Sequence, residues 1–202
     1  MFSLLYGLWK YLFRKDEFFV LIIGLDNAGK TTFLEKTQIT FNPDYKGMPF
    51  DKITTTVGLN MGKVEIGSVR LVFWDLGGQE ELQSLWDKYY AESHAVIYVI
   101  DSSDPDRLEE SRLAFEEMLK SEALYSVPVL VLGNKQDLEG CLSVSDIKKE
   151  FNKSSSLIGK RDCHIQASSG LTGKGVDDGI NWVVQCVQRN VYRRPPRSEE
   201  IS

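Results

Sequence analysis

Hydrophobic residues along this chain follow two patterns that alternate from one end to the other. Unbroken apolar segments are typical of strands buried on both faces of a sheet, whereas apolar residues at helical spacing indicate helices that pack on a sheet. Apolar segments predict strands at 18–23, 95–100, 127–132 and 163–166, and a hairpin formed by 61–67 and 69–75. Spacing and start signals predict helices at 103–124, 143–151 and 176–191, and one that begins near Lys30.

Strands that alternate with helices predict an α/β fold with a mostly parallel sheet and helices on both of its faces. The hairpin adds one antiparallel edge strand to what we expect to be a six-stranded sheet. Ligands of such sheets bind beyond the carboxyl ends of the strands. The loops that follow the strands are therefore where functional residues are expected.

The two ends of the chain depart from this pattern. In 1–15, apolar residues from Phe2 to Phe13 repeat at helical spacing, which predicts a short amphipathic helix. Its charges follow the apolar stretch and no small-residue cleavage site is present, so a signal peptide is not indicated. The segment 193–202 has little apolar content and is expected to be a flexible tail, which leaves 16–192 as one domain.

Composition narrows the class of protein. A chain of 202 residues, 42% hydrophobic and 26% charged, is ordinary for a globular protein with one buried core. A net charge of -5 argues against a nucleic-acid binder, but the segment 1–15 contains basic residues and no acidic one, which suits a membrane surface. The three cysteines form no C-x-x-C pair and are expected to be reduced thiols.

The segment 24–31 (GLDNAGKT) follows the first predicted strand and opens the first helix. It fits the pattern G-x-x-x-x-G-K-[ST], whose backbone N–H groups surround a phosphate chain. In this pattern Lys30 reaches the β- and γ-phosphates and the Thr31 hydroxyl binds Mg²⁺. The nucleotide-binding residues expected here are Asp26, Asn27, Ala28, Gly29, Lys30, Thr31 and Thr32.

The base is indicated by the segment 134–137 (NKQD), which follows the strand at 127–132. The Asp137 carboxylate can accept hydrogen bonds from the guanine N1–H and 2-amino groups, and adenine offers neither donor on that edge. Asn134 can bridge to the phosphate loop, and the stem of Lys135 can lie over the base. GTP and GDP are therefore the expected ligands.

A second glycine-containing segment, 74–80 (WDLGGQE), follows the second hairpin strand. Asp75 is placed to hold magnesium through water, and the N–H of Gly78 can approach a γ-phosphate. Gln79 is then the expected catalytic residue, because it can orient the attacking water. A threonine run at 54–56 can complete the magnesium shell when a γ-phosphate is present.

These motifs resemble those of the ADP-ribosylation-factor family of small GTPases. The resemblance covers about 2–190 and includes GLDNAGKT, TTVGLN, WDLGGQE, LWDKYY, VIDSSDPDRLEES and NKQDL. It implies the P-loop small GTPase fold and a GTP-hydrolysing switch that works with an exchange factor, a GTPase-activating protein and effectors. Since no arginine lies between 33 and 56, we expect slow hydrolysis that a partner's arginine accelerates.

The resemblance also assigns roles to single residues. It makes Thr56 the second magnesium ligand beside Thr31, and it places Ala167 and Ser168 in a loop that contacts guanine. The residues implied to form an apolar effector patch are Leu59, Trp74 and Tyr89.

Departures from the family pattern bear on membrane attachment. Phe2 stands where the family usually has a myristoylated glycine, so that modification is excluded. We expect Met1 to be acetylated instead and recognised by a membrane receptor, on the cytosolic face of the Golgi apparatus and trans-Golgi network, with a cytosolic pool. The loop 38–52 is longer than usual, which is expected to alter the choice of exchange factor or effector.

Three other functions remain open from the sequence. A P-loop ATP enzyme is disfavoured by the NKQD and GGQ segments. A nucleotide-dependent adaptor with negligible hydrolysis is disfavoured because Lys30, Thr31, Thr56 and Gln79 are all present. A cytosolic regulator of other enzymes, without membrane contact, is disfavoured by the segment 1–15.

Overall fold

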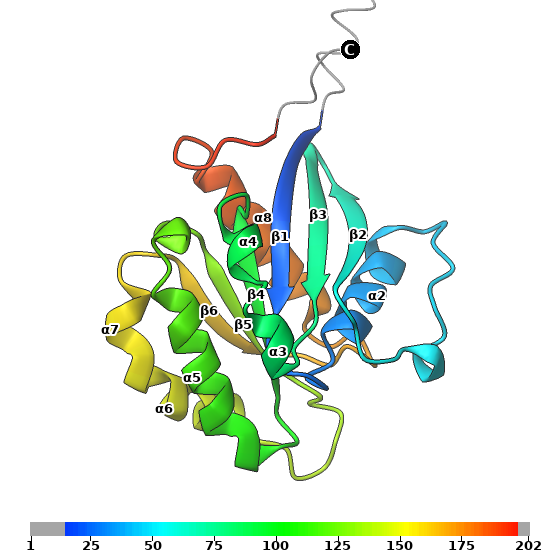
Figure 1. Cartoon of the computed structure of the whole chain (residues 1–202). Helices are drawn as coiled ribbons and strands as arrows, with labels where there is room; N and C mark the ends of the chain where they lie inside the picture. The colour runs from blue at the N-terminus through cyan, green and yellow to red at the C-terminus, as the bar shows by residue number, and fades with distance from the viewer. Residues whose placement is uncertain (1–14, 198–202) are drawn as a thin grey trace, which may run out of the picture.

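The computed structural model describes residues 15–197. A six-stranded sheet runs through it, in the strand order β2-β3-β1-β4-β5-β6 (Figure 1). Its strands are β1 (Asp16–Ile23), β2 (Leu59–Ile66), β3 (Val69–Leu76), β4 (Ala95–Asp101), β5 (Val129–Asn134) and β6 (Cys163–Ala167). Only β2, at one edge, runs antiparallel to its neighbour. The predicted mostly parallel sheet with one antiparallel edge strand is confirmed.

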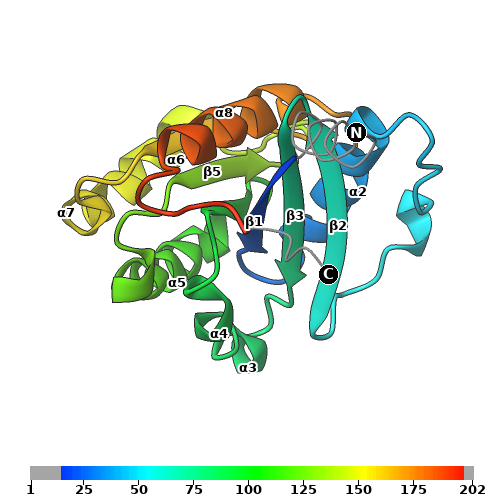
Figure 2. The same cartoon turned by 90° about the horizontal axis from the view of Figure 1, so that it is seen from above.

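Helices cover both faces of this sheet (Figure 2). One face carries α2 (Lys30–Phe41) and α8 (Val176–Arg189), and the other carries α5 (Leu108–Leu119), α6 (Val144–Phe151) and α7 (Ser155–Ile158). Shorter pieces are α3 (Glu80–Gln83), α4 (Asp87–Tyr90), η1 (Phe50–Lys52), η2 (Pro105–Arg107), η3 (Glu122–Leu124) and η4 (Asn152–Ser154). None of the helices in the described range is long and apolar enough to cross a membrane.

The apolar run of β1 divides between two cores. Alternate side chains leave a strand on opposite faces, so Phe18, Val20 and Ile22 pack toward α2 and α8. Phe19 and Leu21 pack toward the helices of the other face. A central strand in this position needs apolar residues at every position, which explains why its sequence does not alternate.

One helix prediction is confirmed in detail and another differs. The capping box at the start of α6 is confirmed, since the Ser143 hydroxyl accepts from the Asp146 N–H at 3.2 Å. The single helix expected over 103–124 is instead η2, α5 and η3. Ser121 has extended backbone dihedrals (φ -66°, ψ 122°) and interrupts the helix there.

The ends of the domain also need a correction. Residues 193–197 were expected to belong to a flexible tail, but they pack back against the start of β1, where Arg197 pairs with Glu17. Composition gave no sign of this because the contacts come from arginine side chains and main-chain groups. The expected N-terminal helix falls outside the described residues except for Lys15, which directly precedes β1.

Candidate functional site

The phosphate loop is a tight turn between the end of β1 and the start of α2. Gly24 has φ +140°, and a Cβ on it would lie 2.2 Å from the Val99 carbonyl oxygen, so the backbone can pass only as glycine. The Lys30 ammonium closes the loop by donating to the carbonyl oxygens of Gly24 at 3.0 Å and Leu25 at 2.7 Å. The loop thus holds a lysine at the N-terminus of a helix, where anions bind.

The protonation of Lys30 depends on the charges around it. Burial lowers the pKa of this ammonium to about 8, an effect that the nearby carboxylates of Asp75 and Asp26 oppose. A phosphate chain would add negative charge next to the ammonium and favour its protonated form.

A cavity of about 620 Å³ opens beside the loop, within the size range of small-molecule sites. Its walls come from the phosphate loop, the threonine run, and the loops after β3 and β5. The lining residues are Asp26, Asn27, Gly29, Lys30, Thr31, Thr32, Ile53, Thr54, Thr55, Thr56, Gly78 and Lys135.

Three oxygen-bearing side chains meet on one side of this cavity. The Thr31 hydroxyl lies 2.7 Å from that of Thr56 and donates to Asp75 Oδ2 at 2.7 Å. The other carboxylate oxygen, Oδ1 of Asp75, is buried and has no hydrogen-bond partner among the described residues. Burial raises the pKa of Asp75 while its hydrogen bond with Thr31 opposes that rise. Hydroxyl and carboxylate oxygens are the ligand type that Mg²⁺ prefers, so this set fits a magnesium ion.

The loop after β3 lies directly against the phosphate loop. The Asp26 N–H donates to the Gly78 carbonyl oxygen at 3.1 Å, and a Cβ on Gly78 would lie 2.4 Å from Asp26 N. Gln79 is partly exposed and begins α3 as its N-terminal cap residue. It adjoins the cavity through Gly78, but its own side chain is not among those that line it.

Asn134 ties the base-binding loops to the phosphate loop. It is 2% exposed, and its amide donates to the Ala28 carbonyl oxygen at 2.8 Å. Its Oδ1 accepts from the Gly170 N–H at 2.9 Å and from the Ser168 hydroxyl at 3.3 Å. The three loops expected to hold a guanine nucleotide are therefore joined through one buried side chain.

The other base-binding residues lie around this junction. Lys135 has φ +64° and forms an ion pair with Asp101 at 2.5 Å. The Asp137 carboxylate accepts from the Ser169 hydroxyl at 2.5 Å, which fixes its orientation. Ala167 is the last residue of β6 and precedes Ser168 directly. Sequence reasoning missed Ser169, although it follows an expected guanine contact.

Arg107 is a second residue that sequence reasoning missed. It donates to Asp26 Oδ1 at 2.7 Å from outside the phosphate loop, and Glu110 holds the same guanidinium at 2.9 Å. Its position in the chain could have identified it, because it follows β4 at the carboxyl edge of the sheet, where ligands bind.

The expected effector residues lie together at the sheet edge, on the face away from α2. Leu59 is 40% exposed, and Val57, just before β2, and Met61, within β2, are more exposed still. Trp74 lies opposite Met61 in the ladder and is mostly covered, with its ring 5.4 Å from that of Tyr89. We call Val57, Leu59, Met61, Trp74 and Tyr89 the apolar patch.

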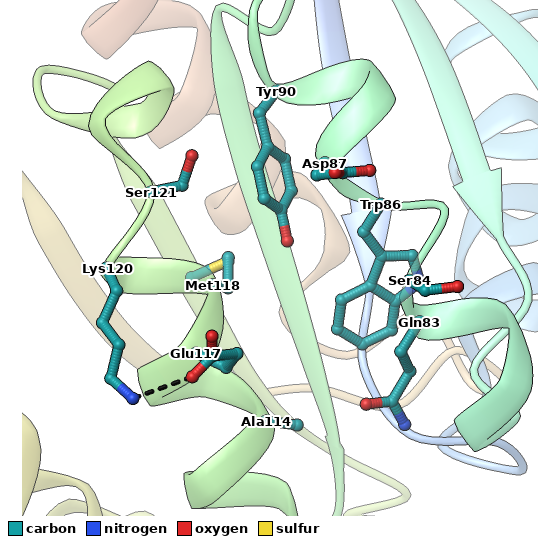
Figure 3. A pocket seen from close by; sticks show the side chains of 10 residues that line it. All are labelled: Gln83, Ser84, Trp86, Asp87, Tyr90, Ala114, Glu117, Met118, Lys120 and Ser121. Atoms are coloured by element: carbon teal, nitrogen blue, oxygen red, sulfur yellow. Dashed lines mark hydrogen bonds and ion pairs between the residues drawn. The ribbon is translucent and has the colours of Figure 1, made fainter.

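A separate hollow of about 500 Å³ lies between α4 and α5 (Figure 3). Trp86, Tyr90 and Met118 form its walls, and an ion pair between Glu117 and Lys120 lies on its rim. The Trp86 indole donates to the Gly77 carbonyl oxygen at 3.0 Å and so steadies the loop after β3. The hollow shares no lining residue with the phosphate cavity.

Comparisons with known proteins agree with this geometry. A sequence model of the ADP-ribosylation factor family matches residues 5–187. ADP-ribosylation factor-related protein 1 from Bos taurus is 66% identical over all 202 residues of both chains. ADP-ribosylation factor-like protein 3 from Saccharomyces cerevisiae is 42% identical over 97% of this chain and 98% of its own.

A solved structure is also similar. It is the Arl6 BBS3 small GTPase from Trypanosoma brucei with the bound nucleotide analogue GppNp, at a TM-score of 0.74 and 33% identity, over 86% of this chain and 98% of that one. The chain therefore belongs to the ADP-ribosylation factor family and is a small GTPase, a guanine-nucleotide switch that hydrolyses GTP.

Proposed function

We propose that this GTPase controls traffic at the Golgi apparatus and trans-Golgi network by recruiting effectors to the membrane in its GTP-bound state. The observation that carries the switch is the oxygen cluster of Thr31, Thr56 and Asp75. It joins the phosphate loop to the segments before β2 and at the end of β3. A ligand that holds this cluster together therefore orders both segments at once.

Each site residue has a role in this proposal. Magnesium would neutralise charge on the phosphates when bound, and Thr31 and Thr56 would hold it directly while Asp75 would do so through water. Lys30 and the backbone N–H groups of 26–32 bind the phosphates. Guanine is held by Asn134, Lys135, Asp137, Ala167 and Ser168.

Hydrolysis needs few groups from the protein. Gln79 orients a water molecule toward the γ-phosphate, and the Gly78 N–H binds a γ-phosphate oxygen. The described part of the chain offers no free arginine beside this cavity, because Arg107 is engaged by Asp26 and Glu110. We therefore propose slow intrinsic turnover, which an activating protein raises about 10³–10⁵-fold with its own arginine.

Membrane attachment is proposed from the sequence of 1–15. An amphipathic helix alone binds membranes weakly, so a second signal is needed. Acetylation of Met1 would remove the terminal charge and make this end easier to insert or to be bound by a Golgi receptor. The named relatives, ADP-ribosylation factor-related proteins, are consistent with such a switch.

Membrane partitioning tests the proposal directly. The full chain and a chain that lacks 1–14, each loaded with GDP or a non-hydrolysable GTP analogue, are sedimented with Golgi-like vesicles. We expect the GTP-loaded full chain to bind most, and equal binding of all four samples would contradict the proposal.

An adaptor with negligible hydrolysis is the second candidate. It is supported by the fact that Gln79, unlike its neighbour Gly78, is not among the residues that line the cavity. Single-turnover hydrolysis with and without Gln79→Leu separates the two functions. Equal rates in both proteins would favour the adaptor.

A further inference from the structure

The first four residues of β1, 16–19, have one edge that no strand of the sheet covers. β1 pairs with β3 from Asp16 onward, but with β4 only from Val20 onward. The C-terminal segment 193–197, which we call the strap, lies against this open stretch (Figure 1). The Arg197 N–H donates to the Glu17 carbonyl oxygen at 2.9 Å, as a short antiparallel bridge.

Arg194 anchors the strap to two other segments. Its guanidinium donates to the carbonyl oxygens of Ala91 at 2.9 Å and Ser93 at 3.1 Å, just before β4. It also donates to the Ala123 carbonyl oxygen in η3. Arg194 is partly buried, and this burial lowers the pKa of its guanidinium. A side chain that serves only a loose tail would have no such partners.

His94 joins the strap to β1. Its Nδ1 accepts from the Phe19 N–H at 3.0 Å, so its Nε2 carries the proton and donates to the Pro195 carbonyl oxygen at 2.9 Å. The Phe19 carbonyl oxygen in turn accepts from the His94 N–H at 2.8 Å. Both main-chain groups of Phe19 on this edge are therefore satisfied by one residue that the strap holds in place.

The strap also reaches the side chain of Phe19. The Arg197 guanidinium carbon lies 5.5 Å from the centre of the Phe19 ring, in a cation–π contact. The Phe19 ring also stacks on Trp74, with ring centres 4.5 Å apart. Trp74 then contacts Tyr89 in the apolar patch. Contacts therefore run without interruption from the C-terminal strap to the patch.

We propose that the strap positions the apolar patch: Arg194 and Arg197 hold Phe19 beneath Trp74, so that the C-terminal residues set the shape of the surface that partners bind. Arg194 and Arg197 are positioning residues in this proposal, since neither belongs to the patch. The proposal depends on the proposed function only for the role of the patch as a partner surface. The strap's effect on Trp74 can be measured whatever the partner is.

The test uses the GDP-loaded protein and acrylamide quenching of Trp74 fluorescence. The Trp74 signal is obtained as the difference between each protein and the same protein with Trp74→Phe. In Arg194→Ala, and in a chain that ends at Tyr192, we expect quenching to rise about twofold or more, because a side chain 9% exposed has most of its surface to gain. Hydrogen exchange at the Phe19 amide should accelerate in the same proteins.

Arg193→Ala is the matched control, because Arg193 is an exposed strap arginine whose side chain makes none of these contacts. A second control ends the chain at Arg197 and keeps the whole strap. Both controls should behave as wild type. Unchanged quenching in Arg194→Ala and in the chain that ends at Tyr192 would overturn the proposal. An equal rise of quenching in Arg193→Ala would also overturn it. A rise accompanied by faster GDP release would do the same, because either result would indicate general destabilisation.

Discussion

Replacing Asn134 should weaken nucleotide binding far more than the loss of one surface contact would. In Asn134→Ala, the buried Ala28 carbonyl oxygen and Gly170 N–H both lose their partner, which lay at 2.8 and 2.9 Å. An orphaned buried group costs about 1–3 kcal/mol. The Ser168 hydroxyl can rotate to another acceptor, so it adds little.

The penalty should fall on the nucleotide-bound state. A bound nucleotide requires the three loops in this arrangement, whereas without it the loops can relax and take water as their partner. Two orphaned groups at the lower to middle part of the range give about 3 kcal/mol, which is more than a hundredfold in affinity at about 1.4 kcal/mol per tenfold. Asn134→Asp should also lose affinity, because a carboxylate oxygen would face the Ala28 carbonyl oxygen.

Displacement of a fluorescent GDP analogue measures this loss. Asn190→Ala is the control, since Asn190 donates one hydrogen bond to the Ser126 carbonyl oxygen at 3.0 Å, away from the cavity. That variant should lower the melting temperature and leave the GDP affinity unchanged. A folded Asn134→Ala protein that binds GDP within about threefold of wild type would refute the reasoning, since that ratio corresponds to well under 1.4 kcal/mol.

Three further predictions concern catalysis, the phosphate loop and the strap. Gln79→Leu should lower single-turnover GTP hydrolysis about a hundredfold with GDP affinity unchanged, and an equal fall in affinity would show a binding role instead. Arg107→Ala should speed GDP release about fivefold, since the freed Asp26 carboxylate would repel phosphate and a part-exposed pair contributes up to about 1 kcal/mol. Adding Asp26→Ala should remove that effect, and a persistent acceleration would point to lost packing. Burial lowers the pKa of His94 below its ordinary 6.5. As pH falls below about 6.5, the unfolded protein therefore binds more protons at this residue than the native one, and the stability of the native protein should drop. His94→Gln, which keeps a donor and an acceptor, should flatten this part of the melting-temperature profile between pH 7.5 and pH 5.5, and an unchanged slope would exclude His94 as its source.

The sheet could be predicted because its strands carry their own signal. Apart from their ends, β1, β4 and β5 are buried on both faces, so their central positions form largely apolar runs that stand out in the sequence. The site loops follow these strands directly, and their glycines mark where backbone must pass close to a partner. The family resemblance then supplied Thr56, Ala167 and Ser168, whose types alone carry little information.

Residues that act through long-range contacts could not be found in this way. Arg107 follows β4 at the edge where ligands bind, but it meets Asp26 from 81 positions away in the chain, and no local pattern identifies that partner. The strap was missed for the same reason, because Arg194 has main-chain oxygens as partners, which every sequence provides. Met61 could not be predicted as part of the apolar patch, because single exposed apolar residues are common and only the neighbouring side chains show that it belongs to a patch.

The hairpin of β2 and β3 has a mechanical consequence. At one end, Leu59 pairs with Leu76, and the Gly77 N–H donates to the Gly58 carbonyl oxygen at 3.1 Å. Thr56 and Gly78 lie in the loops just beyond this end. At the other end, about 25 Å away for strands of this length, the Ser68 carbonyl oxygen accepts from the Asp16 N–H. Two strands that are hydrogen-bonded along their whole length move together as one rigid unit. We therefore expect a pull on either loop by a γ-phosphate to be transmitted to the opposite end of the hairpin, beside the start of β1.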